Sequence, residues 1–219
     1  MSSDLSGITI TKLSLPDMSY NQVPVYPTPK IPVFLIAMLG SVERAENIAK
    51  LIQKFNPIIQ RAITNNSPQV GNCLSHLQVA RTAKLLFPNS PYLVLEDDAE
   101  VVDSKFWTLV EEHKDVDLLY FGYNNSCSHY KPIPTEYVWG THAVLISPSA
   151  RDAIIEKYDE VNNMEFWTQY VGFDSMLTVI AHLAKLKSWK PAKEDRYKYI
   201  CQKEGYTSFL SGCKRKNNL

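Results

Sequence analysis

The stretch Tyr92-Leu93-Val94-Leu95-Glu96-Asp97-Asp98-Ala99-Glu100 joins an apolar run of strand length to four carboxylates within five positions. Carboxylates this close repel one another, so the stretch favours a nearby cation. Mg²⁺ and Mn²⁺ prefer oxygen ligands, and a metal held by one or two carboxylates keeps positions free for phosphate groups. Taken alone, the cluster fits a solvated loop at a strand end equally well. The neighbouring sequence has to distinguish a metal site from a solvated loop.

The composition is that of a folded protein with one domain of ordinary size. In 219 residues, 45% are hydrophobic and 11% aromatic, which is enough to build a substantial core. The 23 basic and 23 acidic residues cancel, so no overall charge favours nucleic acid as a partner. The four cysteines are widely spaced, which disfavours structural zinc and fits reduced thiols.

The chain shows no apolar stretch of membrane-spanning length and no N-terminal signal pattern. We therefore expect a soluble protein without a transmembrane segment, in the cytoplasm of a bacterium or of a host cell infected by a virus. Residues 1–30 contain four prolines and are expected to form an extended arm, followed by the domain proper at 31–190. The segment 191–219 is basic: ten Lys or Arg against three Asp or Glu lie between Lys185 and Leu219. Such an end could face a phosphate or only keep the tail in solution.

Strands and helices alternate along the predicted domain. Apolar runs predict strands at residues 33–39, 58–63, 92–96, 117–123 and 137–146. Helical spacing and capping residues predict helices at 42–55, 72–87 (with Asn72 as its cap), 106–113, 148–158 and 174–187. This order indicates an α/β fold with a mixed, mainly parallel sheet flanked by helices. Because ligands of such sheets bind beyond the carboxyl ends of the strands, the position of Glu96 favours the metal interpretation.

Three segments share their order and spacing with one known family. They are Gly71-Asn72-Cys73-Leu74-Ser75-His76-Leu77, then Leu93-Val94-Leu95-Glu96-Asp97-Asp98, then Trp139-Gly140-Thr141-His142-Ala143-Val144-Leu145-Ile146-Ser147. Together they resemble glycosyltransferase family 25, the group of lipopolysaccharide and collagen galactosyl- or glucosyltransferases. The resemblance implies a Rossmann-like fold of the GT-A type. It also implies a nucleotide-sugar donor, with a UDP-sugar favoured, Mn²⁺ or Mg²⁺, and transfer of a hexose to a glycan or glycoprotein hydroxyl with inversion.

The resemblance also assigns roles to single residues. Asp98, helped by Glu96, would hold the metal, which neutralises the diphosphate leaving group, and Glu96 or Asp97 would contact the donor. Asp174 matches the acidic position before the last core helix and is the candidate base that takes the proton of the acceptor hydroxyl. From local sequence, Asp174 fits the N-cap of that helix at least as well.

Four further residues are candidate donor contacts, each with an ordinary structural alternative. They are Arg44, Ser75, His76 and His142. Arg44 would look the same as a surface residue, a histidine at a helix start is more often a structural hydrogen-bonding group, and His142 also fits the core. Trp139 could stack on a sugar ring, although core packing is the usual role of a tryptophan.

Two other functions remain open. A Mg²⁺-dependent phosphohydrolase or nucleotidyltransferase also places carboxylates at a strand end, but the chain lacks an Asp-x-Asp-x-Thr pattern and a Gly-rich phosphate loop. A sugar-binding relative that does not catalyse transfer is the other alternative, and retention of the three acidic residues at 96–98 argues against it.

Overall fold

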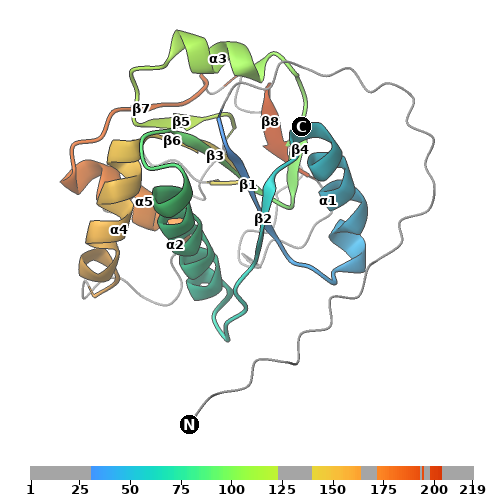
Figure 1. Cartoon of the computed structure of the whole chain (residues 1–219), viewed down its shortest axis with the longest axis horizontal. Coiled ribbons are helices and arrows are strands. Elements are labelled where there is room, and N and C mark those ends of the chain that lie inside the picture. The colour runs from blue at the N-terminus through green and yellow to red at the C-terminus, as the bar shows by residue number, and fades with distance from the viewer. Residues whose placement is uncertain (1–30, 123–139, 164–171, 193, 195–197, 204–219) are drawn as a thin grey trace.

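The computed structural model describes residues 31–122, 140–163, 172–192, 194 and 198–203, and these form an α/β fold as predicted (Figure 1). The strands are β1 (Val33–Ala37), β2 (Ile58–Arg61), β3 (Tyr92–Glu96), β4 (Ala99–Val101), β5 (Leu118–Tyr120), β6 (Ala143–Ile146), β7 (Ser188–Trp189) and β8 (Ile200–Gln202). The helices within the described residues are α1 (Val42–Phe55), α2 (Pro68–Leu86), α3 (Phe106–Glu112), α4 (Pro148–Asn162) and α5 (Phe173–Leu183).

Six strands make one sheet in the order β2-β1-β3-β6-β5-β7. Strand β1 is parallel to β2 and β3, and β5 is parallel to β7, whereas β6 is antiparallel to both of its neighbours. The sheet is therefore mixed and mainly parallel, which confirms the predicted fold class. Strands β4 and β8 form a separate antiparallel pair. Strand β8 lies beyond residue 190, and the predicted domain limits at 31 and 190 stay a prediction.

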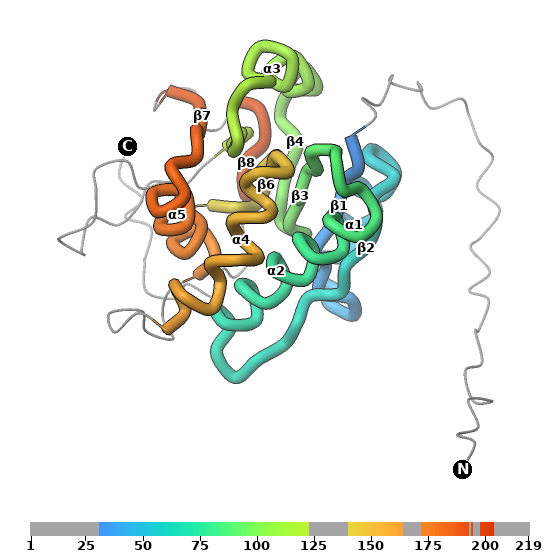
Figure 2. Tube along the Cα trace, turned by 60° about the vertical axis from the view of Figure 1, so that its left-hand side comes forward, coloured from blue at the N-terminus to red at the C-terminus, as the bar shows by residue number. Residues whose placement is uncertain are grey.

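Helices cover both faces of the sheet, and each face has its own hydrophobic core. In β1, Phe34 and Ile36 join the cluster formed with α2, α4 and α5, while Val33, Leu35 and Ala37 join the cluster formed with α1 and α3. A strand buried on both faces needs an unbroken apolar run. For this reason the apolar runs of the sequence predict β1 and β3 correctly. Figure 2 shows α2 and α4 side by side, in agreement with their contacts.

The second helix begins earlier than predicted. Helix α2 starts at Pro68, four residues before Asn72, and Ser67 has the extended backbone of an N-cap residue. Proline is favoured at the first helical position because the missing N–H group has no partner there anyway. The prediction that Asn72 caps this helix is therefore wrong. Its side chain instead faces the acidic end of β3.

The last helix also differs from its predicted bounds. Helix α5 begins at Phe173 with Gly172 at the N-cap, so Asp174 lies in the first turn and the N-cap alternative for it is wrong. The helix ends at Leu183 rather than at 187, and Lys185 then adopts a left-handed backbone with φ of 54° before β7.

The remaining differences from the predicted bounds concern one helix end and several strands. Helix α4 continues four residues past its predicted end at 158. Strand β6 begins at Ala143, and residues 137–139 of the strand predicted there lie outside the described residues. Strands β4, β7 and β8 contain two or three residues each, too few for an alternating pattern. Within the described part of the chain, every helix is too short or too polar to span a bilayer.

Candidate functional site

The acidic turn after β3 lies against the loop after β1. The backbone N–H of Met38 donates to Oδ2 of Asp97 at 2.7 Å. Strand β1 lies between β2 and β3, so the chain order reverses at this point of the sheet. Open α/β sheets bind their ligands in the crevice that forms at such a reversal. The predicted location of the site is therefore consistent with the topology.

Arg44 is the cation that the carboxylates required. It lies in the first turn of α1, is 9% exposed, and its Nη1 bonds Oδ1 of Asp97 and lies 3.9 Å from Oδ2 of Asp98. Asn47 adds hydrogen bonds from Nδ2 to the carbonyl oxygens of Asp97 and Ala99, at 2.8 and 2.9 Å. Arg44, expected to contact the donor, thus compensates the charge of Asp97, and both carboxylate oxygens of Asp97 accept from protein donors.

Asp98 has one carboxylate oxygen without a partner among the described residues. Its Oδ2 accepts from Nε2 of Gln202 at 2.7 Å, and its carbonyl oxygen accepts from the N–H of Lys203 at 2.7 Å. Its Oδ1 is buried, and no residue in the described part of the chain forms a hydrogen bond with it. Burial, and after it the charge of Glu96, raise the pKa of Asp98 above its ordinary value of 3.8. More positive charge at this oxygen would stabilise the ionised form, so Asp98 fits a cation ligand.

Strand β8 brings Gln202 to the acidic turn and packs tightly against the end of β5. A Cβ atom at Gly122 would overlap the carbonyl oxygen of Ile200, so only glycine allows this approach. The same oxygen accepts from Nε2 of His142 at 3.3 Å. Burial lowers the pKa of His142 and so favours the neutral ring. Because a carbonyl oxygen can only accept, a neutral His142 bonds it with the proton on Nε2. His142 therefore supports β8 from the core, the ordinary role considered for it above.

Glu96 is the centre of a second hydrogen-bond network. Its Oε1 accepts from Nδ2 of Asn72 at 3.3 Å and from Oγ1 of Thr141 at 2.9 Å, and it lies 2.9 Å from Nε2 of His76. Burial opposes ionisation, but the hydrogen bond and charge of His76 hold the pKa of Glu96 below 4.5. Glu96 is thus an ionised acceptor with one oxygen already committed to three side chains.

Asp174 lies beside this network in the first turn of α5. Its Oδ1 accepts from the N–H of Ser175 at 2.9 Å, and its Oδ2 accepts from the N–H of Gly140 at 3.3 Å. The residue is partly exposed. Burial of the carboxyl group, and after it the charge of Glu96, raise the pKa of Asp174 to about 6. A carboxylate that is ionised at neutral pH but more basic than usual suits a general base.

Two of the predicted donor contacts have structural partners. Ser75 is 1% exposed, donates from Oγ to the carbonyl oxygen of Gly71 at 2.7 Å, and accepts from the N–H of Ile63 at 2.8 Å. It ties the end of β2 to α2 and lies inside the protein. His76 is 2% exposed and stacks on the ring of Phe173, with a centroid distance of 4.1 Å and an interplanar angle of 6°.

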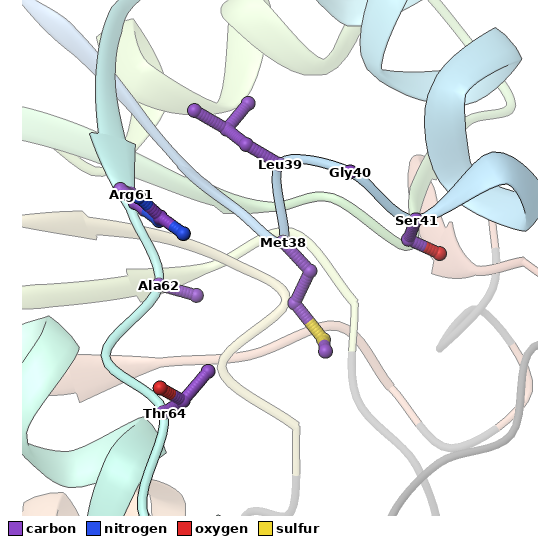
Figure 3. Close-up of a pocket in the computed structure, with 7 residues that line it drawn as sticks. All are labelled: Met38, Leu39, Gly40, Ser41, Arg61, Ala62 and Thr64. Atoms are coloured by element: carbon purple, nitrogen blue, oxygen red, sulfur yellow. The ribbon is translucent and has the colours of Figure 1, made fainter.

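A cavity of about 270 Å³ opens at the carboxyl ends of β1 and β2 (Figure 3). Its lining residues are Met38, Leu39, Gly40, Ser41, Arg61, Ala62 and Thr64. The turn after β1 depends on Gly40, whose φ of 100° favours glycine. Arg61 and Thr64 were not predicted as site residues. Their only signal in the sequence was their place at the end of a predicted strand. Met38 connects this cavity to Asp97 through its backbone N–H.

The described residues contain no cluster of three His, Cys, Asp or Glu side chains arranged to hold a metal ion. A metal bound to Asp98 would therefore need ligands from a phosphate group and water. Trp139, the candidate for stacking on a sugar, lies outside the described residues. The class of protein that fold and site define is an α/β protein with a buried acidic turn at the reversal point of its sheet.

No protein-family model matches the chain, and no curated protein sequence matches it. Several solved structures are similar to it, including the following two. A glycosyltransferase involved in the glycosylation of the major capsid of PBCV-1 has 13% identity and a TM-score of 0.43, with 64% of this chain and 69% of that chain covered. The protein A197 from STIV has 12% identity and a TM-score of 0.47, with 81% of this chain and 96% of that chain covered. Membership of glycosyltransferase family 25 stays a resemblance.

Proposed function

We propose that the protein is a glycosyltransferase that moves a hexose from a nucleotide-sugar donor, with a UDP-sugar favoured, to a hydroxyl group of a glycan or glycoprotein. One observation carries this proposal: a cavity at the ends of β1 and β2 adjoins an acidic turn in which Asp98 has an unpartnered oxygen. The sequence motifs that resemble family 25 contribute Glu96, Asp98 and Gly140 to the same region, and the GT-A arrangement they imply is compatible with the observed sheet.

The cavity is the proposed site for part of the donor. Its volume of about 270 Å³ is at the lower limit of small-molecule sites, which measure roughly 300–1,000 Å³. It therefore suits the nucleoside portion rather than a whole nucleotide sugar. Arg61 in the lining offers a positive charge, and Ser41 and Thr64 offer hydroxyl groups. The diphosphate would then extend from the cavity toward the acidic turn.

Asp98 is the proposed ligand of Mn²⁺ or Mg²⁺. A divalent ion supplies positive charge that neutralises the leaving diphosphate. Asp98 offers its buried Oδ1, while Gln202 fixes Oδ2 and so sets the direction of the carboxylate. Arg44 compensates Asp97 in the same turn. Since Glu96 already accepts three hydrogen bonds on one oxygen, we assign it to positioning rather than to the metal.

Asp174 is the proposed base. The acceptor oxygen attacks the anomeric carbon, its proton passes to the carboxylate of Asp174, and the bond to the diphosphate breaks with the electron pair leaving on the diphosphate. Attack opposite to the leaving group inverts the anomeric carbon. The phosphohydrolase alternative is less favoured because the chain lacks the Asp-x-Asp-x-Thr pattern of an aspartate nucleophile.

Calorimetric titration with UDP and GDP tests the donor site. We expect UDP to bind in the presence of Mn²⁺ and its affinity to fall at least about tenfold, or 1.4 kcal/mol, in EDTA, because the phosphates lose the cation that holds them to Asp98. Binding that is equally strong in EDTA would contradict the proposed role of the metal. If neither nucleotide binds, the proposed donor site is wrong.

A further inference from the structure

Asn72 connects the acidic end of β3 to the start of α5. Its Nδ2 donates to Oε1 of Glu96 at 3.3 Å, and its Oδ1 accepts from the backbone N–H of Phe173 at 3.1 Å. The carboxylate needs a donor and the backbone N–H needs an acceptor, so the network fixes the orientation of the amide. One side chain on α2 thus holds two elements that lie 24 and 101 residues away along the chain.

Among the described residues near its start, helix α5 has no side-chain cap of its own. Gly172 occupies the N-cap position with an extended backbone and makes no side-chain hydrogen bond. The first N–H groups of a helix lack partners inside it and need an acceptor from elsewhere. Asn72 supplies that acceptor from another helix. A Cβ atom at Gly172 would lie 3.1 Å from Oδ1 of Asp174 and 3.9 Å from Oδ1 of Asn72, so the small residue leaves room for both.

We propose that Asn72 is a positioning residue: it caps α5 from α2 and thereby holds the first turn, which carries Asp174, in place relative to Glu96. This inference rests on the proposed function, in which Asp174 is the base. Displacing a catalytic group by about 1 Å can lower a rate by about 100-fold even when substrate binding is intact. The capping bond of Asn72 opposes such a displacement.

Two other links join Glu96 to the same turn. His76 lies 2.9 Å from Glu96 and stacks on the ring of Phe173. Thr141 donates to Glu96 at 2.9 Å, while the neighbouring Gly140 donates its N–H to Asp174 at 3.3 Å. Gly140 has a φ of 110°, which favours glycine and gives the N–H its direction. Glu96 thus contacts all three side chains, and Asn72 is the one that also bonds the backbone of α5.

Amide hydrogen exchange at Phe173 tests the capping bond without any substrate. In Asn72→Ala the exchange should become at least about tenfold faster, because the N–H loses its acceptor. Gln78→Ala removes an exposed amide from the same helix and serves as the control. Unchanged exchange at Phe173 in Asn72→Ala would overturn the proposal.

Steady-state kinetics test the positioning role. With a nucleotide-sugar donor, Asn72→Ala should lower kcat by about 10- to 100-fold and leave the KM for the donor unchanged, because the donor cavity does not include α5. An equal loss in donor affinity would contradict the role. If the wild-type protein transfers no sugar while Asn72→Ala accelerates exchange at Phe173, the capping link stands and the transferase proposal fails.

Discussion

Replacing Asp98 by Asn is expected to stabilise the fold and to weaken nucleotide binding in Mn²⁺. Asp98 is 3% exposed, and one of its carboxylate oxygens has no partner within the described ranges. An Asn side chain keeps an acceptor for Gln202 and removes the buried negative charge, which should stabilise the protein by about 0.5–2 kcal/mol. The same change removes the charge that attracts the metal. Function and stability therefore oppose each other at this position.

The stabilisation should depend on pH in a defined direction. The pKa of Asp98 is raised in the folded state, so between its ordinary value of 3.8 and the raised value the folded state binds more protons than the unfolded state. Stability of the wild-type protein then falls as the pH rises through this interval. The advantage of Asp98→Asn should be absent below about pH 3.8 and complete above the raised pKa.

Thermal unfolding at several pH values, followed by calorimetric titration with UDP, measures both effects. The control is Asp115→Asn, which removes an exposed carboxylate and should change neither property. An Asp98→Asn variant that is less stable at pH 8 would show that the carboxylate stabilises the fold in its ionised form. Unchanged Mn²⁺-dependent affinity would show that Asp98 does not hold the metal.

Replacing Asp174 by Asn should leave UDP affinity unchanged and lower the transfer rate by about 10²- to 10⁴-fold, the usual contribution of a general base. Asn keeps an oxygen that can accept from the N–H of Ser175, so the first turn of α5 should stay folded. An amide cannot take the proton of the acceptor hydroxyl. Rates measured with saturating donor, together with UDP titration of the same variant, separate the two effects.

The pH profile of the wild-type protein gives a second readout for Asp174. Its pKa of about 6 lies above the ordinary value of 3.8, so the carboxylate takes up a proton as the pH falls below about 6. The transfer rate should then decrease by about tenfold per pH unit on the acid side. A profile that is flat down to pH 5, or full activity in Asp174→Asn, would assign the base to another residue.

The sequence predicted those parts of the fold that depend on residues close together along the chain. Strands β1 and β3 are buried on both faces, and their apolar runs ended at the observed positions within two residues. The start of α2 was missed because Pro68 and the polar residues before it also fit a loop. Asn72 was misassigned for the same reason: an asparagine before an apolar helix fits a local cap, and nothing nearby indicates that it caps α5 instead.

Local sequence patterns could not predict which distant residues contact one another in the site. The sequence indicated that the acidic turn needs a cation, but Arg44 lies 53 residues from Asp97, and no spacing rule joins them. Gln202 lies 104 residues from Asp98, on a strand of three residues with no recognisable pattern. Ser75 was correctly located in a helix, but His142, predicted inside a strand, lies one residue before β6. Whether the two side chains face the crevice or the core depends on how the neighbouring elements pack.

Backbone amide spectra of the isotope-labelled protein, recorded with Mg²⁺ while UDP is added, test most directly whether the cavity and the acidic turn bind a nucleotide together. Our account predicts that the shifting signals belong to residues 38–41, 61–64 and 97–98, while those of α3 stay in place. Shifts confined to other parts of the protein, or none at saturating UDP and GDP, would contradict the proposed donor site.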